Sequence, residues 1–110
     1  MTLRPPESLV VETIAHATGV RAQVRGDLDP IGSPALVDQV SAVLGADADG
    51  ELTLDLAGVD FCDSAGASAL VTLRQRCAQA GWRFQMVNLR PAVRRILVDF
   101  TGLGDYLNVR

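Results

Sequence analysis

A serine next to an aspartate stands where the sequence predicts that a strand passes into a helix. Before this point, leucines alternate with polar residues, as in a strand with one buried face, at Leu52, Leu54 and Leu56. After it, apolar residues recur at helical spacing, at Leu70, Leu73, Cys77 and Ala80. The hydroxyl of Ser64, which follows Asp63, is therefore expected near a helix N-terminus. There it could hydrogen-bond free backbone N–H groups or receive a phosphate, and the spacing alone favours a simple helix cap.

The other polar residues give little support for a catalytic set. No G-x-S-x-G sequence surrounds Ser64, and the only histidine, His16, falls in a predicted hairpin. The chain contains no lysine, which excludes a P-loop lysine, a Schiff-base amine and a receiver-type phosphoacceptor domain. Four aspartates could be read as a cation site, but Asp also favours turns and caps, at Asp27, Asp29, Asp60 and Asp63. We expect no catalytic residues and no enzyme activity.

The cysteines predict neither a metal centre nor a disulfide framework. Cys62 and Cys77 are the only two, and neither belongs to a C-x-x-C or Cys/His cluster. Both fall on apolar positions, so buried free thiols are expected. We predict no metal and no cofactor.

Length and charge restrict the class of protein. With 110 residues, the chain is expected to form a single domain over residues 8–110 behind a flexible tail, residues 1–7, that contains two prolines. A net charge of −3 and an isoelectric point near 4.9 give no electrostatic footprint for nucleic acid. We find no signal peptide and no apolar run long enough to span a bilayer, so a cytoplasmic protein without membrane insertion is expected.

Hydrophobic periodicity predicts an α/β fold in the order β-β-α-β-α-β-α. The expected strands are residues 9–14, 20–25, 51–56 and 82–86. The expected helices begin at an N-cap Ser33 and end at Gly45, run from Ser64 to Gly81, and run from Pro91 to Gly102 with Val93, Ile96, Leu97 and Phe100 inward. Residues 26–30, 46–50 and 57–60 are expected as breaks or linkers, and residues 105–109 as a short tail that docks back. Strand–helix–strand units imply parallel strands, so the expected architecture is a small mixed sheet with packed helices.

Two polar segments are expected to share one edge of this sheet. Asp27-Leu28-Asp29 and Asp63-Ser64 each follow a predicted strand that leads into a helix. Sites in such sheets gather at the carboxyl ends of the strands. The topology therefore predicts one surface containing both segments.

Three motifs together resemble the STAS family, in particular the bacterial anti-sigma factor antagonists. They are GDLD at residues 26–29, LDLAGVDFCDSAG at residues 54–66 and RPAVRRILVDFTGLGDYL at residues 90–107. The resemblance implies a partner switch rather than catalysis. In such proteins, an anti-sigma factor with serine kinase activity phosphorylates the serine that follows the motif aspartate, and the unphosphorylated form binds that factor and frees the sigma factor.

Carried over by position, the resemblance makes Ser64 the phosphoacceptor and places Asp29 on the kinase-facing surface. Asp27 replaces the usual Glu, Ala65 leaves Ser64 the only hydroxyl of the motif, and Ala67 replaces a common Leu, which reduces a hydrophobic contact with the partner. The implied partner-binding residues are Asp27, Asp29, Asp63, Ser64, Ala65, Gly66, Ala67 and Ser68. We expect a monomer or weak dimer. The alternative is a STAS scaffold or accessory subunit of a transport or signalling complex, in which Ser64 only caps its helix.

Overall fold

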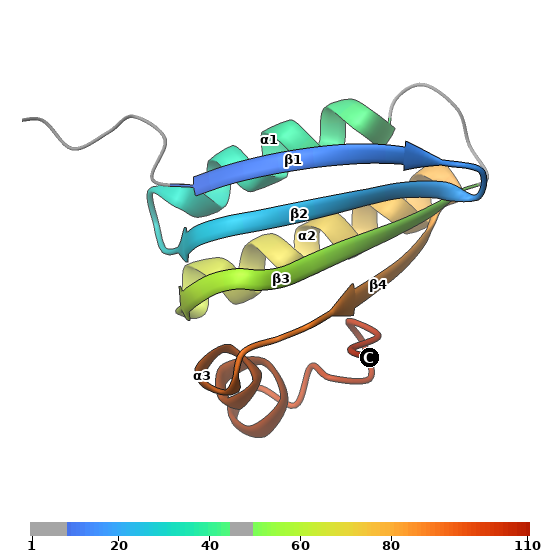
Figure 1. The fold of residues 1–110 in the computed structure, drawn as a ribbon. Coiled ribbons are helices and arrows are strands. Elements are labelled where there is room, and N and C mark those ends of the chain that lie inside the picture. The colour runs from blue at the N-terminus through green and yellow to red at the C-terminus, as the bar shows by residue number, and fades with distance from the viewer. Residues whose placement is uncertain (1–8, 45–49) are drawn as a thin grey trace, which may run out of the picture.

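The computed structural model of the protein describes residues 9–44 and 50–110. The described residues form a four-stranded sheet in the order β1-β2-β3-β4 (Figure 1). Its strands are β1 (Leu9–His16), β2 (Gly19–Leu28), β3 (Glu51–Cys62) and β4 (Arg83–Val87). The helices are α1 (Gly32–Leu44), α2 (Ser64–Ala80) and α3 (Pro91–Arg94), which continues as the π-helical segment η1 (Arg95–Phe100). The expected tail at residues 1–7, the helix stop at Gly45 and most of the connection over residues 46–50 lie outside the described residues.

The pairing of the strands confirms the predicted mixed sheet. β1 and β2 form an antiparallel hairpin, whereas β2–β3 and β3–β4 are parallel. α1 connects β2 to β3, and α2 connects β3 to β4, as parallel neighbours require. The carboxyl ends of β2 and β3 therefore lie at the same edge, directly before α1 and α2.

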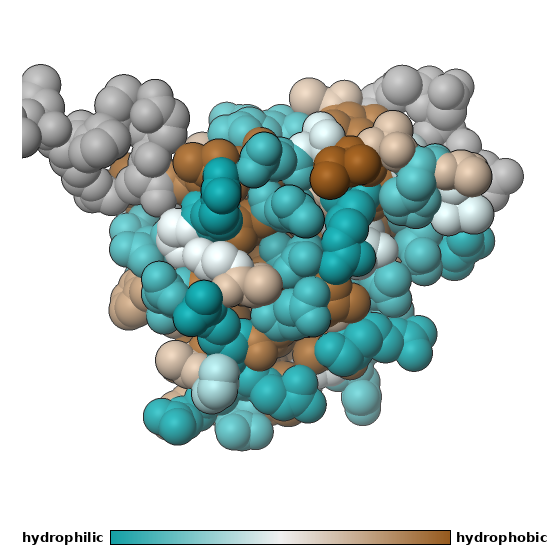
Figure 2. All heavy atoms as spheres, in the orientation of Figure 1, coloured by the Kyte–Doolittle hydropathy of each residue, from teal (hydrophilic) through white to brown (hydrophobic). Residues whose placement is uncertain are grey.

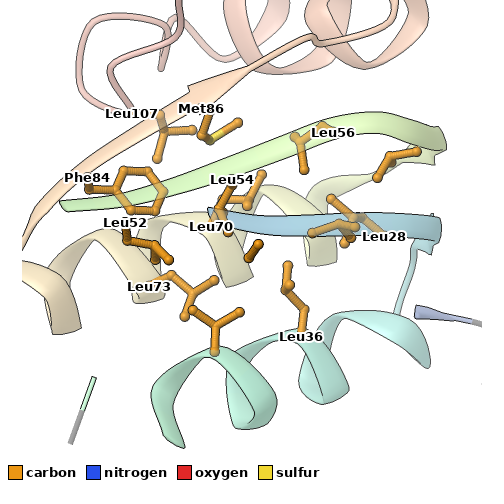
Figure 3. Close-up of a cluster of buried hydrophobic side chains, with 14 of the residues drawn as sticks. Leu28, Leu36, Leu52, Leu54, Leu56, Leu70, Leu73, Phe84, Met86 and Leu107 are labelled. Carbon is orange, nitrogen blue, oxygen red and sulfur yellow. The ribbon is translucent and has the colours of Figure 1, made fainter. Parts of the chain in front are cut away.

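The core lies between the sheet and the two long helices. Figure 1 shows α1 and α2 behind the strands, and Figure 3 shows leucines of α1 and α2 meeting those of β2 and β3. The labelled side chains are buried: Leu28, Leu36, Leu52, Leu54, Leu56, Leu70, Leu73, Phe84, Met86 and Leu107. Leu107 comes from the C-terminal segment, where Val109 bridges to Met86 and the Arg110 N–H donates to the Met86 carbonyl at 2.8 Å. The prediction that this segment docks back is confirmed.

The opposite face of the sheet is polar. Figure 2 shows mainly hydrophilic side chains on this side, with scattered hydrophobic ones. Arg25 pairs with Glu12 at 3.0 Å, and Arg21 pairs with Asp55 at 2.9 Å across β2 and β3. Burial alone would raise the pKa of Asp55, but hydrogen bonds from the Ala57 N–H and from Arg21 outweigh it and lower the pKa below its ordinary value.

Three strands are longer than their sequence patterns indicated: β1 ends two residues later, at His16, and β2 and β3 extend by more. Residues 26–28 do not break β2, and residues 57–60 are not a linker, because β2 and β3 stay paired as far as Leu28 and Cys62. Register shifts after Gln23 and after Gly26 give β3 extra residues relative to β2. Such β-bulges interrupt the alternation of apolar residues without ending the strand, so a period-2 pattern misses them.

The last helix also differs from the expectation at one position. Val93 and Leu97 are buried and Ile96 is partly buried, but the side chain of Phe100 is 75% exposed. In η1 the Thr101 N–H donates to the Ile96 carbonyl at 3.1 Å, which is the i→i+5 pattern of a π-helix. This wider turn breaks the 3.6-residue period that predicted Phe100 to face inward.

Candidate functional site

The two polar segments expected at one edge of the sheet are joined there. Leu28 of β2 pairs with Cys62 of β3, and the next residue, Asp63, donates its backbone N–H to the Leu28 carbonyl at 3.2 Å. Asp27 pairs with Phe61 one step earlier in the ladder. The prediction that Asp27-Leu28-Asp29 and Asp63-Ser64 share one edge is therefore confirmed.

Asp63, and not Ser64, caps α2. A carboxylate oxygen of Asp63 accepts hydrogen bonds from the N–H groups of Ala65 at 2.9 Å and Gly66 at 3.1 Å. The backbone of Asp63 is extended, as is usual for an N-cap residue. Ser64 is the first helical residue, and it is exposed. The interpretation of Ser64 as the cap was wrong because a carboxylate one residue earlier already satisfies the free N–H groups.

Asp29 has the same function in front of α1. A carboxylate oxygen of Asp29 accepts hydrogen bonds from the N–H groups of Ile31 at 3.0 Å and Gly32 at 2.6 Å, and its carbonyl accepts from Ser33 at 2.9 Å. Ser33, predicted as the N-cap, instead lies inside the first turn. It is buried, and within the described part of the chain its hydroxyl oxygen has no hydrogen-bond partner. Asp29 is half-buried, and it contributes to the fold by capping α1.

Glycines allow both helices to start close to the end of β2. A Cβ on Gly32 would lie 2.3 Å from the Asp27 carbonyl oxygen, and a Cβ on Gly66 would lie 2.6 Å from the Leu28 carbonyl oxygen. A Cβ on Gly66 would also lie 2.8 Å from the Cys62 sulfur. A larger residue at either position would push the helix start away from the strand.

The residues predicted to bind a partner differ in exposure. Ser64 and Ser68 are exposed, one helical turn apart, and Ala65 is half-exposed beside them. Gly66 and Ala67 are buried and offer little surface. Asp27, Asp29 and Asp63 are half-buried. The accessible part of the motif is therefore a narrow strip along α2.

Cys62, directly before this motif, has an unreactive thiol. Cys62 is buried, and its thiol donates to the Asp63 carbonyl at 3.6 Å. Burial, with the nearby Asp63 charge, raises the pKa of Cys62 to about 11, so the thiol stays protonated near neutral pH. Among the described residues, no group of three or more His, Cys, Asp or Glu side chains could hold a metal ion.

The sequence patterns did not predict a groove that lies next to Ser64. It has a volume of about 440 Å³ and runs between α2 and the segment after η1. Its apolar lining includes Ala67, Val71 and Leu103, and Ser64 is one of its polar lining residues. Thr101 and Leu103 are far from Ser64 in sequence, so only the fold brings them together; the available signal was the docking of the C-terminal segment.

The comparisons with known proteins agree with this architecture. Residues 14–107 match the family described as "Mlab, STAS domain". An anti-sigma factor antagonist from Mycobacterium paratuberculosis superposes with a TM-score of 0.81 at 29% identity, over 97% of this chain and 89% of that one. SpoIIAA, an anti-sigma factor antagonist in its unphosphorylated form, gives 0.73 at 20% identity, over 93% and 87% of the two chains.

A transporter shares the fold as well. The murine anion transporter Slc26a9 superposes with a TM-score of 0.71 at 24% identity, over 82% of this chain but 16% of the transporter. At identities below 25%, such matches show a common fold. In the described part of this chain, no helix combines the length and hydrophobicity that a membrane crossing requires. The family match covers most of the sequence, and the chain belongs to the STAS domain family.

Proposed function

We propose that this protein is an anti-sigma factor antagonist that acts by partner switching. In its unphosphorylated form it binds an anti-sigma factor with serine kinase activity, which then releases its sigma factor. Phosphorylation of Ser64 ends this binding. One observation carries the proposal: Ser64 is an exposed hydroxyl on the first residue of α2, and Asp63 already provides the helix cap.

The position of Ser64 allows a phosphate to be added without unfolding the domain. The Asp63 carboxylate, not the Ser64 hydroxyl, holds the free N–H groups of Ala65 and Gly66. A phosphate on Ser64 therefore breaks none of these hydrogen bonds. The positive end of the α2 dipole also favours a negative group at this position.

The same phosphate would change the surface that a partner meets. It adds about −1.5 to −2 charge at neutral pH, next to Asp63 and at the edge that contains Asp27 and Asp29. A partner surface that fits a neutral hydroxyl would have to desolvate this charge. The phosphate group is also larger than the hydroxyl and would clash with that surface. Binding is thus lost although the fold is kept.

The cell compartment and the lack of catalysis are part of the proposal. We propose a cytoplasmic protein that has no turnover of its own and needs no cofactor or metal. The protein is the substrate of its partner's kinase activity, and its own contribution is a switchable surface.

The test is mass spectrometry after incubation with ATP and each purified anti-sigma factor of the same genome that contains a serine kinase domain. We expect one phosphate on Ser64 with the cognate kinase and none in this motif of the Ser64→Ala variant, because Ala65 leaves no second hydroxyl there. The Ser64→Ala variant should still bind that kinase, whereas the Ser64→Asp variant should bind poorly. Phosphate on Ser33, Ser41 or Ser68 instead of Ser64, or equal binding of the Ser64→Asp variant, would overturn the switch.

A second candidate is an accessory STAS module of a transport complex. The match to the anion transporter favours it, because that fold occurs there inside a larger chain. In this case Ser64 takes no phosphate, and a transporter subunit rather than an anti-sigma factor copurifies with the protein. A transporter operon around the gene would support this candidate, whereas a neighbouring gene for a sigma factor or a small ATPase-type kinase would support the first.

A further inference from the structure

The first half of α2 presents a surface without charge. From Ser64 to Leu73 the sequence contains no acidic or basic residue, although α2 is a surface helix and Ser64 and Ser68 are exposed. Ser64, Ser68 and Thr72 are four residues apart, so they lie on one face and form a row of hydroxyl groups, here called the hydroxyl ridge. The ridge extends about 12 Å along the helix, at 1.5 Å per residue.

Apolar grooves follow the hydroxyl ridge on both sides. On one side, between α2 and α1, a groove of about 360 Å³ is lined by Pro34, Val37 and Ala69. On the other side, the groove of about 440 Å³ is lined by Val71 and Leu103. Ser68 and Thr72 line both grooves, so the ridge separates them. Figure 1 shows α2 between α1 and the C-terminal elements, in agreement with this arrangement.

Two arginines bridge α2 to its neighbours beyond the residues that line the grooves. Arg76 donates to the Ser41 hydroxyl of α1 at 2.7 Å, which bridges α2 and α1 one turn beyond Thr72. Arg74 donates to the Tyr106 carbonyl at 3.1 Å and lies 4.5 Å from the centre of the Tyr106 ring, which bridges α2 to the C-terminal segment. On α2, the residues that line the two grooves therefore lie between Ser64 and Thr72, before the first charged residue of the helix, Arg74.

We propose that the anti-sigma factor straddles α2, with uncharged apolar side chains in both grooves and its polar groups on the hydroxyl ridge. This inference rests on the proposed function and defines the docking surface of the same site. The bound segment of the partner carries no charged group opposite residues 64–73, because the surface offers none to pair with it and its apolar walls would leave such a group desolvated. A phosphate on Ser64 places a double charge at one end of the ridge and in the lining of the groove that contains Val71 and Leu103.

The experiment places single charges along one face of α2. The variants Ser68→Glu and Thr72→Glu put a carboxylate on the ridge one and two turns away from Ser64. The matched controls Gln75→Glu and Gln79→Glu put the same charge on the same helical face at exposed positions, Gln75 between the two arginines and Gln79 beyond them. Affinity for the purified cognate anti-sigma kinase is measured for each variant, together with circular dichroism to verify folding. Ser68→Glu keeps the test valid if Thr72→Glu disturbs the fold, because Ser68 is exposed whereas Thr72 is half-buried.

We expect both ridge variants to bind at least about tenfold more weakly, as Ser64→Asp does, and both glutamine variants to bind like the wild type. If Ser64→Asp abolishes binding while Ser68→Glu and Thr72→Glu do not, the partner contacts only the start of α2, and the straddling surface is wrong although the switch stands. Equal losses in the ridge variants and in the glutamine controls would also overturn it. If the wild type binds no anti-sigma kinase of the genome, the proposed function fails, and this inference fails with it.

Discussion

The backbone N–H of Asp63 donates to the carbonyl of Leu28 at 3.2 Å, which connects the segment after β3 to the last residue of β2. This hydrogen bond extends the parallel ladder by one step beyond Cys62 and holds the start of α2 next to the segment that leads to α1. Each helix is then capped by the aspartate at its start, Asp29 or Asp63. The site is thus built by two similar strand–Asp–helix junctions whose strands are neighbours.

Replacing Asp63 should destabilise the domain more than replacing Ser64. Asp63→Ala removes the acceptor for the N–H groups of Ala65 and Gly66 and should lower the free energy of unfolding by about 1 kcal/mol. Asp63→Ser keeps a capping oxygen and should cost less. Ser64→Ala should change stability by only a few tenths of a kcal/mol, since an exposed surface position outside the cap has small effects. Urea unfolding of the three variants measures these differences; a Ser64→Ala loss as large as that of Asp63→Ala would contradict the assignment of the cap.

The sequence predicted the order of the elements because their periodic patterns are strong. The leucines of β3 and the apolar positions of α2 reflect one buried face each, and Gly81, with a φ of 83°, ends α2 as expected of a C-cap glycine. The common edge for Asp29 and Ser64 followed from parallel topology alone. The element order follows from local periodicity and the common edge from chain connectivity, and a single sequence contains both kinds of information.

The remaining details depend on contacts between distant segments. The bulges that keep residues 57–60 in β3 form only against β2, and the π-helical turn that exposes Phe100 has no periodic signal. The cap of α2 was assigned one residue too late because Asp63 and Ser64 are both good N-cap residues, and only the backbone geometry distinguishes them. The grooves next to α2 need α1 and the C-terminal segment in place.

The ion pair between Arg21 and Asp55 should make stability depend on pH in the acid range. Because the pKa of Asp55 is lower in the folded state than the ordinary value, the contribution is fully present above the unfolded-state pKa of about 3.9 and is lost as pH falls through the folded-state value. Asp55→Asn should reduce stability at neutral pH and flatten its decline below about pH 4. Unfolding curves across this range, compared with the exposed control Asp60→Asn, measure the effect. A variant that keeps the wild-type slope would show that other carboxylates dominate the acid response.

Both cysteines should react slowly in the folded protein. Burial raises the pKa values of Cys62 and Cys77 to about 11, so few thiolates exist at neutral pH and little of either sulfur is accessible. Labelling with a thiol reagent should be slow under native conditions and complete for both residues in denaturant. Fast labelling of Cys62 in the native protein would indicate that the start of α2 opens.

Asp29 allows the structural and the partner-binding contributions of the same edge to be separated. If Asp29 only contributed to the kinase-facing surface that the resemblance implies, Asp29→Ala would weaken partner binding with little loss of stability. The hydrogen bonds from the Ile31 and Gly32 N–H groups change this expectation, because Asp29→Ala should now cost about 1 kcal/mol of stability as well.

Asp29→Asn is the informative variant, because an amide oxygen can accept the same N–H hydrogen bonds without the charge. We expect Asp29→Asn to unfold at a denaturant concentration close to that of the wild type. If the partner contacts the carboxylate directly, the same variant should bind the anti-sigma kinase more weakly. Chemical denaturation and binding affinity, measured on the same two variants, give the answer. Wild-type affinity in Asp29→Asn combined with weak binding in Asp29→Ala would mean that Asp29 supports the partner surface only by holding the start of α1 in place.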